Sequence, residues 1–204
     1  MLPHLLHLAM RQDTFVAYRR RVVSSAHGLV LEVGAGSGLN IPFYTGASTH
    51  VVGLDPSTRL LAKARQLQRA SASSVDLIAG SAESLPLEDE SIDTVVTTWT
   101  LCSIPDVETA LREVRRVLKP SGQLLFVEHG RALDERVRRW QDRLTPAWKR
   151  LAGGCHLNRP IRQLVEDAGF EIERVDTAYM KGPKPLTFMY EGRARPRLNH
   201  QTSL

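Results

Sequence analysis

Short apolar runs alternate with stretches of helical periodicity from residue 29 onward. The apolar runs have the length and composition of buried strands and lie at residues 29–33, 51–54, 75–79, 94–98 and 123–127. Between them, residues 57–69 and 106–118 place their apolar side chains on one stripe, and Ser57 is suited to cap the first of these helices. Strands that alternate with helices pair in parallel through right-handed crossovers and are covered on both faces. The pattern therefore predicts an α/β fold with a doubly wound sheet.

The last third of the chain has a different pattern. Residues 131–151 carry an apolar stripe at helical spacing that consists of Val137, Trp140, Leu144, Trp148 and Leu151. We expect Pro146 to begin a second helix here, because proline fits the first position of a helix. Asn158 is expected to cap a helix that continues through Ala168 and ends at Gly169. Residues 170–178 and 186–191 predict two late strands joined as a hairpin, which would form an antiparallel edge of the sheet.

Composition is typical of a globular protein of one domain. The 204 residues are 42% hydrophobic and 24% charged, which suits a chain able to bury a sizeable core. No apolar run approaches the roughly 18 residues of a membrane-spanning helix, and residues 1–10 lack the basic start and cleavage site of a signal peptide. Cys102 and Cys155 are too few for a disulfide framework. We therefore expect a cytoplasmic protein.

Positive charge is concentrated toward the C-terminus. Residues 1–130 hold 12 basic and 13 acidic side chains, a balance of −1, whereas residues 131–204 hold 15 and 9, a balance of +6. Such a basic third can meet an anionic partner or be a solvated surface. Six cations flank the apolar stripe of residues 131–151, which leaves two hypotheses. In the first, the stripe packs on the sheet and covers a pocket, which is favoured because the fifth strand needs a covering layer. In the second, the stripe makes peripheral contact with an anionic membrane.

The glycine-rich turn at residues 34–38 is the most informative segment for function. Its spacing is G-x-G-x-G, whereas a dinucleotide-binding turn spaced G-x-G-x-x-G would need glycine in place of Leu39. Glu32 precedes the turn, and its carboxylate would repel a pyrophosphate but suits a ligand with a positive amino group. Asp55 ends the second strand, where a carboxylate can accept hydrogen bonds from both ribose hydroxyls. The small residues of 80–83, after the third strand, are able to border an adenine.

These motifs resemble those of class I S-adenosylmethionine-dependent methyltransferases with a type 11 methyltransferase domain. Residues 111–122 are similar to the helix and turn before the fifth strand of that family, so the resemblance covers residues 29–129. It implies an enzyme with a Rossmann-like, seven-stranded sheet, mostly parallel with an antiparallel C-terminal edge. It also implies S-adenosyl-L-methionine as cofactor and S-adenosyl-L-homocysteine as product.

The resemblance assigns roles to residues of the glycine turn and of the next two loops. Glu32 would hold the methionine amino group, Asp55 the ribose, and Ser81 and Ala82 would flank the adenine. Glu83 has the alternative role of capping a helix. The cofactor-binding residues implied are Glu32, Gly34, Ala35, Gly36, Gly38, Asn40, Asp55, Pro56, Ser57, Ser81, Ala82, Glu83 and Thr98.

The same resemblance suggests how one methyltransferase domain, residues 1–192, is divided. Residues 1–25, with apolar Leu2, Leu5, Leu6, Phe15 and Tyr18, would form a helical lid over the cofactor. Residues 29–129 would bind the cofactor, and residues 131–192 would supply substrate-side helices and edge strands. Residues 193–204 are expected to be a flexible basic tail.

A narrower resemblance concerns the methyl acceptor. The segments around Cys102, His129, Trp140–Trp148 and Gly154–Arg159 are similar to small thiol S-methyltransferases, whereas residues 38–44 are similar to bacterial phospholipid N-methyltransferases. The implied acceptor is small or lipophilic, with a thiol first. The alternatives are a phosphatidylethanolamine-type amine, a quinone-type carbon or oxygen, and a non-catalytic protein that only binds the cofactor.

Candidate catalytic residues end the fifth strand. Glu128 and His129 lie at the sheet edge where ligands bind, so either could be a base, although Glu128 has the alternative of a satisfied buried polar group. Cys102 is interpreted as a small buried residue near the methyl-transfer site. Cys155 and His156 are adjacent, but two cysteines make no four-ligand zinc set, so we expect no metal. The motif of base-amine methyltransferases does not follow the fourth strand, so we expect no nucleic acid.

Overall fold

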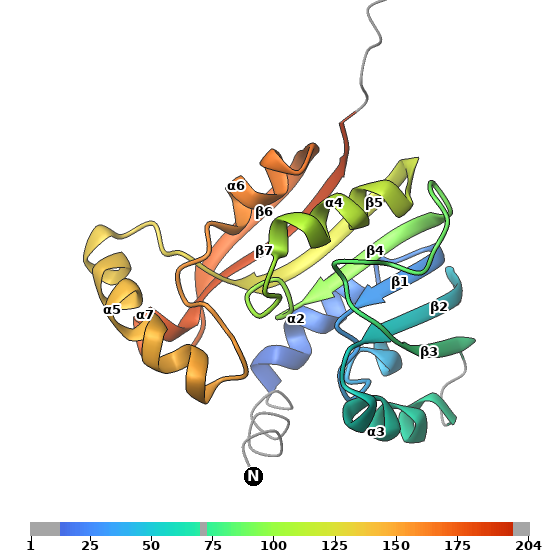
Figure 1. Ribbon diagram of the computed structural model, residues 1–204, viewed down its shortest axis with the longest axis horizontal. Helices are drawn as coiled ribbons and strands as arrows, with labels where there is room; N and C mark the ends of the chain where they lie inside the picture. The colour runs from blue at the N-terminus through green and yellow to red at the C-terminus, as the bar shows by residue number, and fades with distance from the viewer. Residues whose placement is uncertain (1–12, 70–72, 198–204) are drawn as a thin grey trace, which may run out of the picture.

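Seven strands form one sheet in the computed structural model, which describes residues 13–69 and 73–197 (Figure 1). Their order across the sheet is β3-β2-β1-β4-β5-β7-β6. The strands are β1 (Gly28–Val33), β2 (Ser48–Asp55), β3 (Val75–Ala79), β4 (Ile92–Thr98), β5 (Leu118–His129), β6 (Phe170–Tyr179) and β7 (Phe188–Pro196). Strands β1 to β5 pair in parallel, and β7 pairs antiparallel with both β5 and β6. The predicted α/β class and the antiparallel C-terminal pairing are confirmed.

Helices cover both faces of this sheet, as a doubly wound fold requires. In Figure 1, α4 (Val107–Val117) and α6 (Ile161–Asp167) lie above the sheet, and α2 (Asp13–Val23) and α3 (Thr58–Arg69) lie below it. Successive residues of β5 alternate between the two cores, because strand side chains point to opposite faces. Leu124 and Phe126 belong to one core cluster, and Leu125 and Val127 to the other.

The order of the strands creates a crevice at one edge. The chain runs outward from β1 to β2 and β3, and then returns to place β4 on the other side of β1. The connections after β1 and β4 therefore leave the carboxyl edge in opposite directions, which is where ligands bind in sheets of this kind. The connection after β1 contains the single turn η1 (Ile41–Phe43).

The predicted break at Pro146 is wrong, because α5 (Glu135–Leu151) runs through this residue as one helix. Asp134 caps α5 by accepting hydrogen bonds from the N–H groups of Arg136 and Val137. Gln141 anchors the middle of the helix through buried hydrogen bonds to the backbone of Gly130 and Ala132. A proline costs a helix one hydrogen bond and some crowding. Tertiary contacts on α5 outweigh that cost.

Two other predicted boundaries also need correction. Asn158 does not cap α6, whose N-cap is Pro160, and instead donates a hydrogen bond to Asp142 on α5. The flexible tail does not begin at residue 193, because β7 continues to Pro196. Arg193 and Arg195 of β7 both form ion pairs with Glu173 of the neighbouring strand β6. These cross-strand ion pairs stabilise the pairing of β7 with β6 up to this point. Residues 198–204 lie outside the described residues.

The helices of the described residues include none that is both long and apolar enough to span a bilayer.

Candidate active site

A cavity of about 740 Å³ opens at the carboxyl edge of the sheet, at the ends of strands β1 to β5. This volume is within the range of about 300–1,000 Å³ that is common for small-molecule sites. Eleven of the thirteen predicted cofactor-binding residues line it: Glu32, Gly34, Ala35, Gly36, Asn40, Asp55, Pro56, Ser57, Ser81, Ala82 and Thr98. Gly38 and Glu83 do not. The sheet thus gathers residues that are up to 66 positions apart along the chain at one crevice.

The glycines of the turn after β1 serve different purposes. Gly34, Gly36 and Gly38 all have positive φ angles, of +78°, +54° and +81°, which glycine adopts without strain. Gly34 also lies so close to the Thr100 side chain that a Cβ would overlap it. Gly36 faces open space, since a Cβ there would meet no atom closer than 3.8 Å. Gly38 packs against Ile41 and Ala64, so its role is in helix packing and not in the cavity lining.

This difference predicts unequal effects of alanine at two of these glycines. We expect Gly34→Ala to lower the free energy of unfolding by about 2 kcal/mol, because it adds both left-handed strain and a clash with Thr100. Gly36→Ala adds the strain alone and should cost about 1 kcal/mol. Urea denaturation of both variants measures the difference. Equal destabilisation would contradict the packing role of Gly34.

Glu32 is a buried carboxyl group in the lining of the cavity. It accepts hydrogen bonds from Asn40 Nδ2 at 2.9 Å and from the Tyr44 hydroxyl at 2.8 Å. Burial raises its pKa to about 7, although both hydrogen bonds and the nearby charge of Arg19 act in the opposite direction. The structure therefore holds a carboxylate whose ionisation would be favoured by a further positive charge in the cavity.

Asp55 ends β2 on the opposite side of the glycine turn. Its Oδ2 accepts a hydrogen bond from Gly36 N at 2.9 Å, and its Oδ1 accepts one from Ser57 N at 2.8 Å. Burial raises the pKa of Asp55, and the two backbone hydrogen bonds partly offset this. Each carboxylate oxygen keeps a second lone pair for a ligand in the cavity. Ser57 also caps α3, since its hydroxyl accepts a hydrogen bond from Leu60 N, as predicted.

The loop after β3 lines the same cavity as Glu32 and Asp55. Ser81 and Ala82 line it together with Pro56. Glu83 instead accepts hydrogen bonds from the Ser81 hydroxyl and from Asp106 N, at 2.8 Å each. Glu83 thus connects the loop after β3 to the start of α4. This contact at a helix N-terminus resembles the helix-capping role that was its alternative interpretation.

Two further cavity residues, Trp99 and Arg19, were not predicted from the sequence, whereas Phe15 was predicted as part of the lid. Trp99 directly follows β4 with a φ of +52°, a conformation that is rare outside glycine, and its ring lies 5.0 Å from that of Phe15. The Arg19 guanidinium stacks on Trp99, 4.9 Å from the ring centroid, and burial lowers the pKa of Arg19 to about 10. Phe15 and Arg19 belong to α2, so the described part of the predicted N-terminal lid does border the cavity. Leu2, Leu5 and Leu6 of that lid lie outside the described residues.

The candidate bases at the end of β5 lie in different places. His129 lines the cavity, whereas Glu128 is fully buried and does not. Glu128 accepts a hydrogen bond from Thr100 N at 3.1 Å, and burial raises its pKa well above the usual range. Of these two candidates the structure thus brings His129 to the cavity. Glu128 is buried, as in its alternative interpretation, but is not fully satisfied, because its Oε2 has no hydrogen-bond partner among the described residues.

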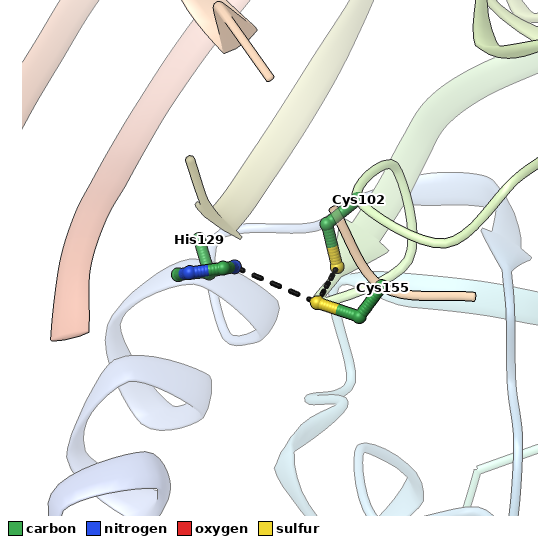
Figure 2. A group of neighbouring side chains, drawn as sticks. All are labelled: Cys102, His129 and Cys155. Carbon is green, nitrogen blue, oxygen red and sulfur yellow. Dashed lines mark hydrogen bonds between the residues drawn. The ribbon is translucent and has the colours of Figure 1, made fainter. Parts of the chain in front are cut away.

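The far end of the cavity combines sulfur atoms with apolar side chains. Cys102, just after β4, and Cys155, just after α5, have their Sγ atoms 3.5 Å apart (Figure 2). A hydrogen bond with Cys155, and then burial, raises the pKa of the Cys102 thiol well above its usual range. The apolar side chains in the cavity lining include Ile104, Trp148, Met180 and Leu186.

Comparison with known proteins agrees with this architecture. The model of the methyltransferase domain family matches residues 31–126. The thiol S-methyltransferase TMT1B of Rattus norvegicus is 36% identical over 148 residues, which are 69% of this chain and 59% of that protein. The human TMT1B is 31% identical over 190 residues, or 89% of this chain and 74% of that protein.

Similarity extends to relatives named for other acceptor classes and to solved structures. A phosphatidylethanolamine N-methyltransferase of Cereibacter sphaeroides is 35% identical over 116 residues, which are 54% of this chain and 57% of that protein. The crystal structure of a SAM-dependent methyltransferase from Methanosarcina mazei has a TM-score of 0.68 at 22% identity, over 83% of this chain and 92% of that one. At this identity the structural match shows a shared fold.

Proposed function

The chain belongs to the S-adenosylmethionine-dependent methyltransferases, and we propose that it transfers the methyl group to a lipophilic thiol. The cavity supports this proposal because it joins a polar half, built around Glu32 and Asp55, to an apolar half that contains His129. When bound, the cofactor supplies a methyl group that is already activated on a sulfonium sulfur. The protein then has to align an acceptor, exclude water and leave a lone pair free on the acceptor atom.

The polar half of the cavity fits S-adenosylmethionine. Asn40 Oδ1 is a buried acceptor without a hydrogen-bond partner among the described residues, next to the carboxylate of Glu32. We infer that Glu32 binds the methionine amino group and that Arg19 binds the methionine carboxylate. Asp55 would accept hydrogen bonds from the ribose hydroxyls, and Ser81 with Ala82 would border the adenine. The ring of Trp99 would close the cavity over the methionine.

The chemistry of the apolar half favours a thiol over an amine. An ammonium acceptor must lose a proton before it can attack, which calls for a carboxylate or histidine close to it. The carboxylates in the cavity lining, Glu32 and Asp55, lie in the polar half, and Glu128 does not reach the lining. His129 is therefore the one histidine or carboxylate of the described lining that could take this proton in the apolar half, whereas a thiol needs no such base. A thiol, with a reference pKa near 8.5, is already partly ionised at about pH 7.5. The relatives named thiol S-methyltransferases agree with this choice.

A panel of acceptors tests the proposed function. The full chain is incubated with S-adenosylmethionine labelled on its methyl group and with aryl and alkyl thiols, a phosphatidylethanolamine and a demethylated quinone. We expect labelled product with lipophilic thiols only. Labelling of the phospholipid or the quinone would instead establish those alternatives, and labelling of none would favour a protein that only binds the cofactor.

The exposed face of α5 supports contact of this enzyme with a membrane surface. Only part of the apolar stripe predicted on this helix is buried: Val137 is, whereas Trp140 and Leu151 are 55% and 61% exposed. Arg143 stacks against Trp140, with 5.7 Å to the ring centroid. An exposed indole beside cations suits the interface of an anionic bilayer. We propose that α5 lies on such a surface, from which a lipophilic thiol could enter the cavity past Trp148.

Replacing cations of α5 should weaken binding to anionic vesicles. We expect the combined variant Arg136→Gln, Arg139→Gln and Arg143→Gln to bind vesicles rich in phosphatidylserine at least about tenfold more weakly at low salt, since each cation near such a surface is worth about 1 kcal/mol. The matched control removes three cations from α3, at Arg59, Lys63 and Arg65, and should bind as the parent does. Vesicle sedimentation measures both. Absence of binding by the parent protein, or an equal loss in both variants, would refute the contact.

A further inference from the structure

Three potential metal ligands from separate segments meet at the apolar end of the cavity. Cys102, His129 and Cys155 each offer one ligand atom, and these atoms all lie within 4.8 Å of one another. Cys155 Sγ is 3.5 Å from Cys102 Sγ and 3.7 Å from His129 Nδ1. Figure 2 shows the two sulfur atoms and this nitrogen turned toward a common point. The motif reasoning missed this set because it considered Cys155 with its neighbour His156.

Two of the three separations match those of a tetrahedral zinc centre, and the third, between Cys102 Sγ and the His129 ring nitrogen, is no more than 4.8 Å. Zinc lies about 2.3 Å from cysteine sulfur and about 2.0 Å from histidine nitrogen, so two ligand atoms of a tetrahedral site are about 3.5–3.8 Å apart. Both separations that involve Cys155 are in this interval. Two cysteines and one histidine also form a known ligand set for catalytic zinc, which leaves the fourth position open.

Backbone contacts hold the segments of this cluster together. His156 N donates a hydrogen bond to Cys102 O at 2.8 Å, directly beside both cysteines. The buried Arg159 donates hydrogen bonds to the carbonyl oxygens of Leu101 and Ile104, on either side of Cys102. The backbone around the two cysteines is therefore held in place before a metal binds, which lowers the entropy cost of binding it.

The charges at the cluster also suit a divalent cation. Two buried thiolates without a partner would be costly, whereas two thiolates and one Zn²⁺ carry no net charge. Arg159 is close enough to interact electrostatically with both cysteines. Its charge would balance one further anionic ligand on the metal.

We propose that Cys102, His129 and Cys155 bind one Zn²⁺, and that its open position, on the cavity side, takes the sulfur of the acceptor. All three residues line the cavity, so a fourth ligand can reach the metal from there. The role of the open position rests on the proposed thiol acceptor, but the three-residue metal site does not.

Zinc in this position would prepare the acceptor for methyl transfer. A thiol that binds zinc releases its proton to solvent and stays nucleophilic as a thiolate. The acceptor sulfur then forms a bond to the methyl carbon, while the bond from that carbon to the sulfonium sulfur breaks and its electron pair remains on that sulfur. The products are a neutral methyl thioether, S-adenosylhomocysteine and the released proton. The thioether is a weaker zinc ligand than the thiolate, which favours its departure.

Metal titration of the whole chain tests the site without any methyl transfer. The protein is stripped with a chelator, kept reduced with a phosphine, and titrated with Zn²⁺ and with Co²⁺, whose spectrum reports thiolate coordination. We expect one ion per chain and a thiolate-to-cobalt charge-transfer band. Cys102→Ser, Cys155→Ser and His129→Gln should each weaken zinc binding at least about a hundredfold, since even an outer partner of a metal ligand is worth 10–100-fold. The matched control His50→Gln, on β2 and outside the cavity, should bind zinc as the parent does.

The possible outcomes separate this inference from the proposed function. Failure of the reduced parent to bind zinc, or zinc binding by Cys102→Ser and Cys155→Ser that is as tight as that of the parent, would overturn the site. Addition of an aryl thiol to the cobalt protein, without cofactor, should change the cobalt spectrum, and an unchanged spectrum would overturn the role of the open position. Thiol methylation at full rate by metal-free protein would overturn the role of zinc and leave the proposed function intact. Zinc binding without methylation of any thiol would overturn the proposed function and the role of the open position, and would leave the three-residue metal site intact.

Discussion

Asp55→Ala will weaken the binding of S-adenosylmethionine by about 10- to 150-fold, which corresponds to about 1.5–3 kcal/mol for lost hydrogen bonds to a charged group. The physical reason is the position of this carboxylate. Both of its oxygens are held by backbone N–H groups, of Gly36 and Ser57, and it faces the cavity at the end of β2. No rotation of the side chain is needed before it accepts hydrogen bonds from a ribose.

Isothermal titration calorimetry measures this effect, with two controls. Asp76→Ala removes an exposed carboxylate of the neighbouring strand β3 and should leave the affinity unchanged. Methylthioadenosine has the ribose and adenine of the cofactor but no amino acid group, and its affinity should fall by a similar factor in Asp55→Ala. A folded Asp55→Ala variant with the parent's affinity would contradict the assignment of Asp55 to the ribose.

The affinity for S-adenosylmethionine will fall as the pH falls through about 7. The pKa of Glu32 in the free protein is raised to about 7 by burial, so this group is neutral below that pH and charged above it. Only the charged form attracts the methionine amino group. The affinity should therefore decrease by roughly a factor of ten per pH unit below 7, which is the behaviour of a single ionisation. Titrations between pH 5.5 and 7.5 measure the slope.

Glu32→Gln isolates the charge of this residue from its shape. The amide has the size of the carboxylic acid and can keep hydrogen bonds with Asn40 and Tyr44. We expect the variant to bind S-adenosylmethionine at least about tenfold more weakly at pH 7.5, because a charge-assisted hydrogen bond is lost, and to show no dependence on pH in this interval. Methylthioadenosine, which lacks the amino group, should bind parent and variant equally. A pH slope that survives in Glu32→Gln would assign the ionisation to another group.

Most of the polar half of the cavity was predictable because it is local in sequence. The run of apolar residues at 29–33, the glycines after it and Asp55 at the end of the next strand are fixed by strand geometry, so their spacing already specifies a crevice. Eleven of the thirteen predicted residues line the cavity for this reason. Gly38 is the instructive exception. Its spacing fits the motif, but only its contacts with Ile41 and Ala64 reveal that it serves packing.

Features that join distant segments could not be read from the pattern. Arg19 is one of three consecutive arginines in α2, and nothing in the sequence distinguishes the one whose side chain is buried against Trp99. Pro146 has the signature of a helix start, yet anchoring of α5 through Gln141 continues the helix past it. In both cases the deciding energies come from contacts with residues outside the helix itself.

The sequence by itself determined the doubly wound sheet, the glycine turn and the carboxylates at the ends of the first two strands, because hydrophobic period and turn chemistry act over a few residues. Only the tertiary structure decided which polar groups share the cavity. Glu128 is buried away from the cavity lining, and Trp140 is exposed on α5. The side chain of Cys155 contacts His129, although its neighbour in the sequence is His156. These outcomes depend on the tertiary contacts at the ends of strands β4 and β5 and of helix α5. The position of a side chain at the end of an element is set by its neighbours in space.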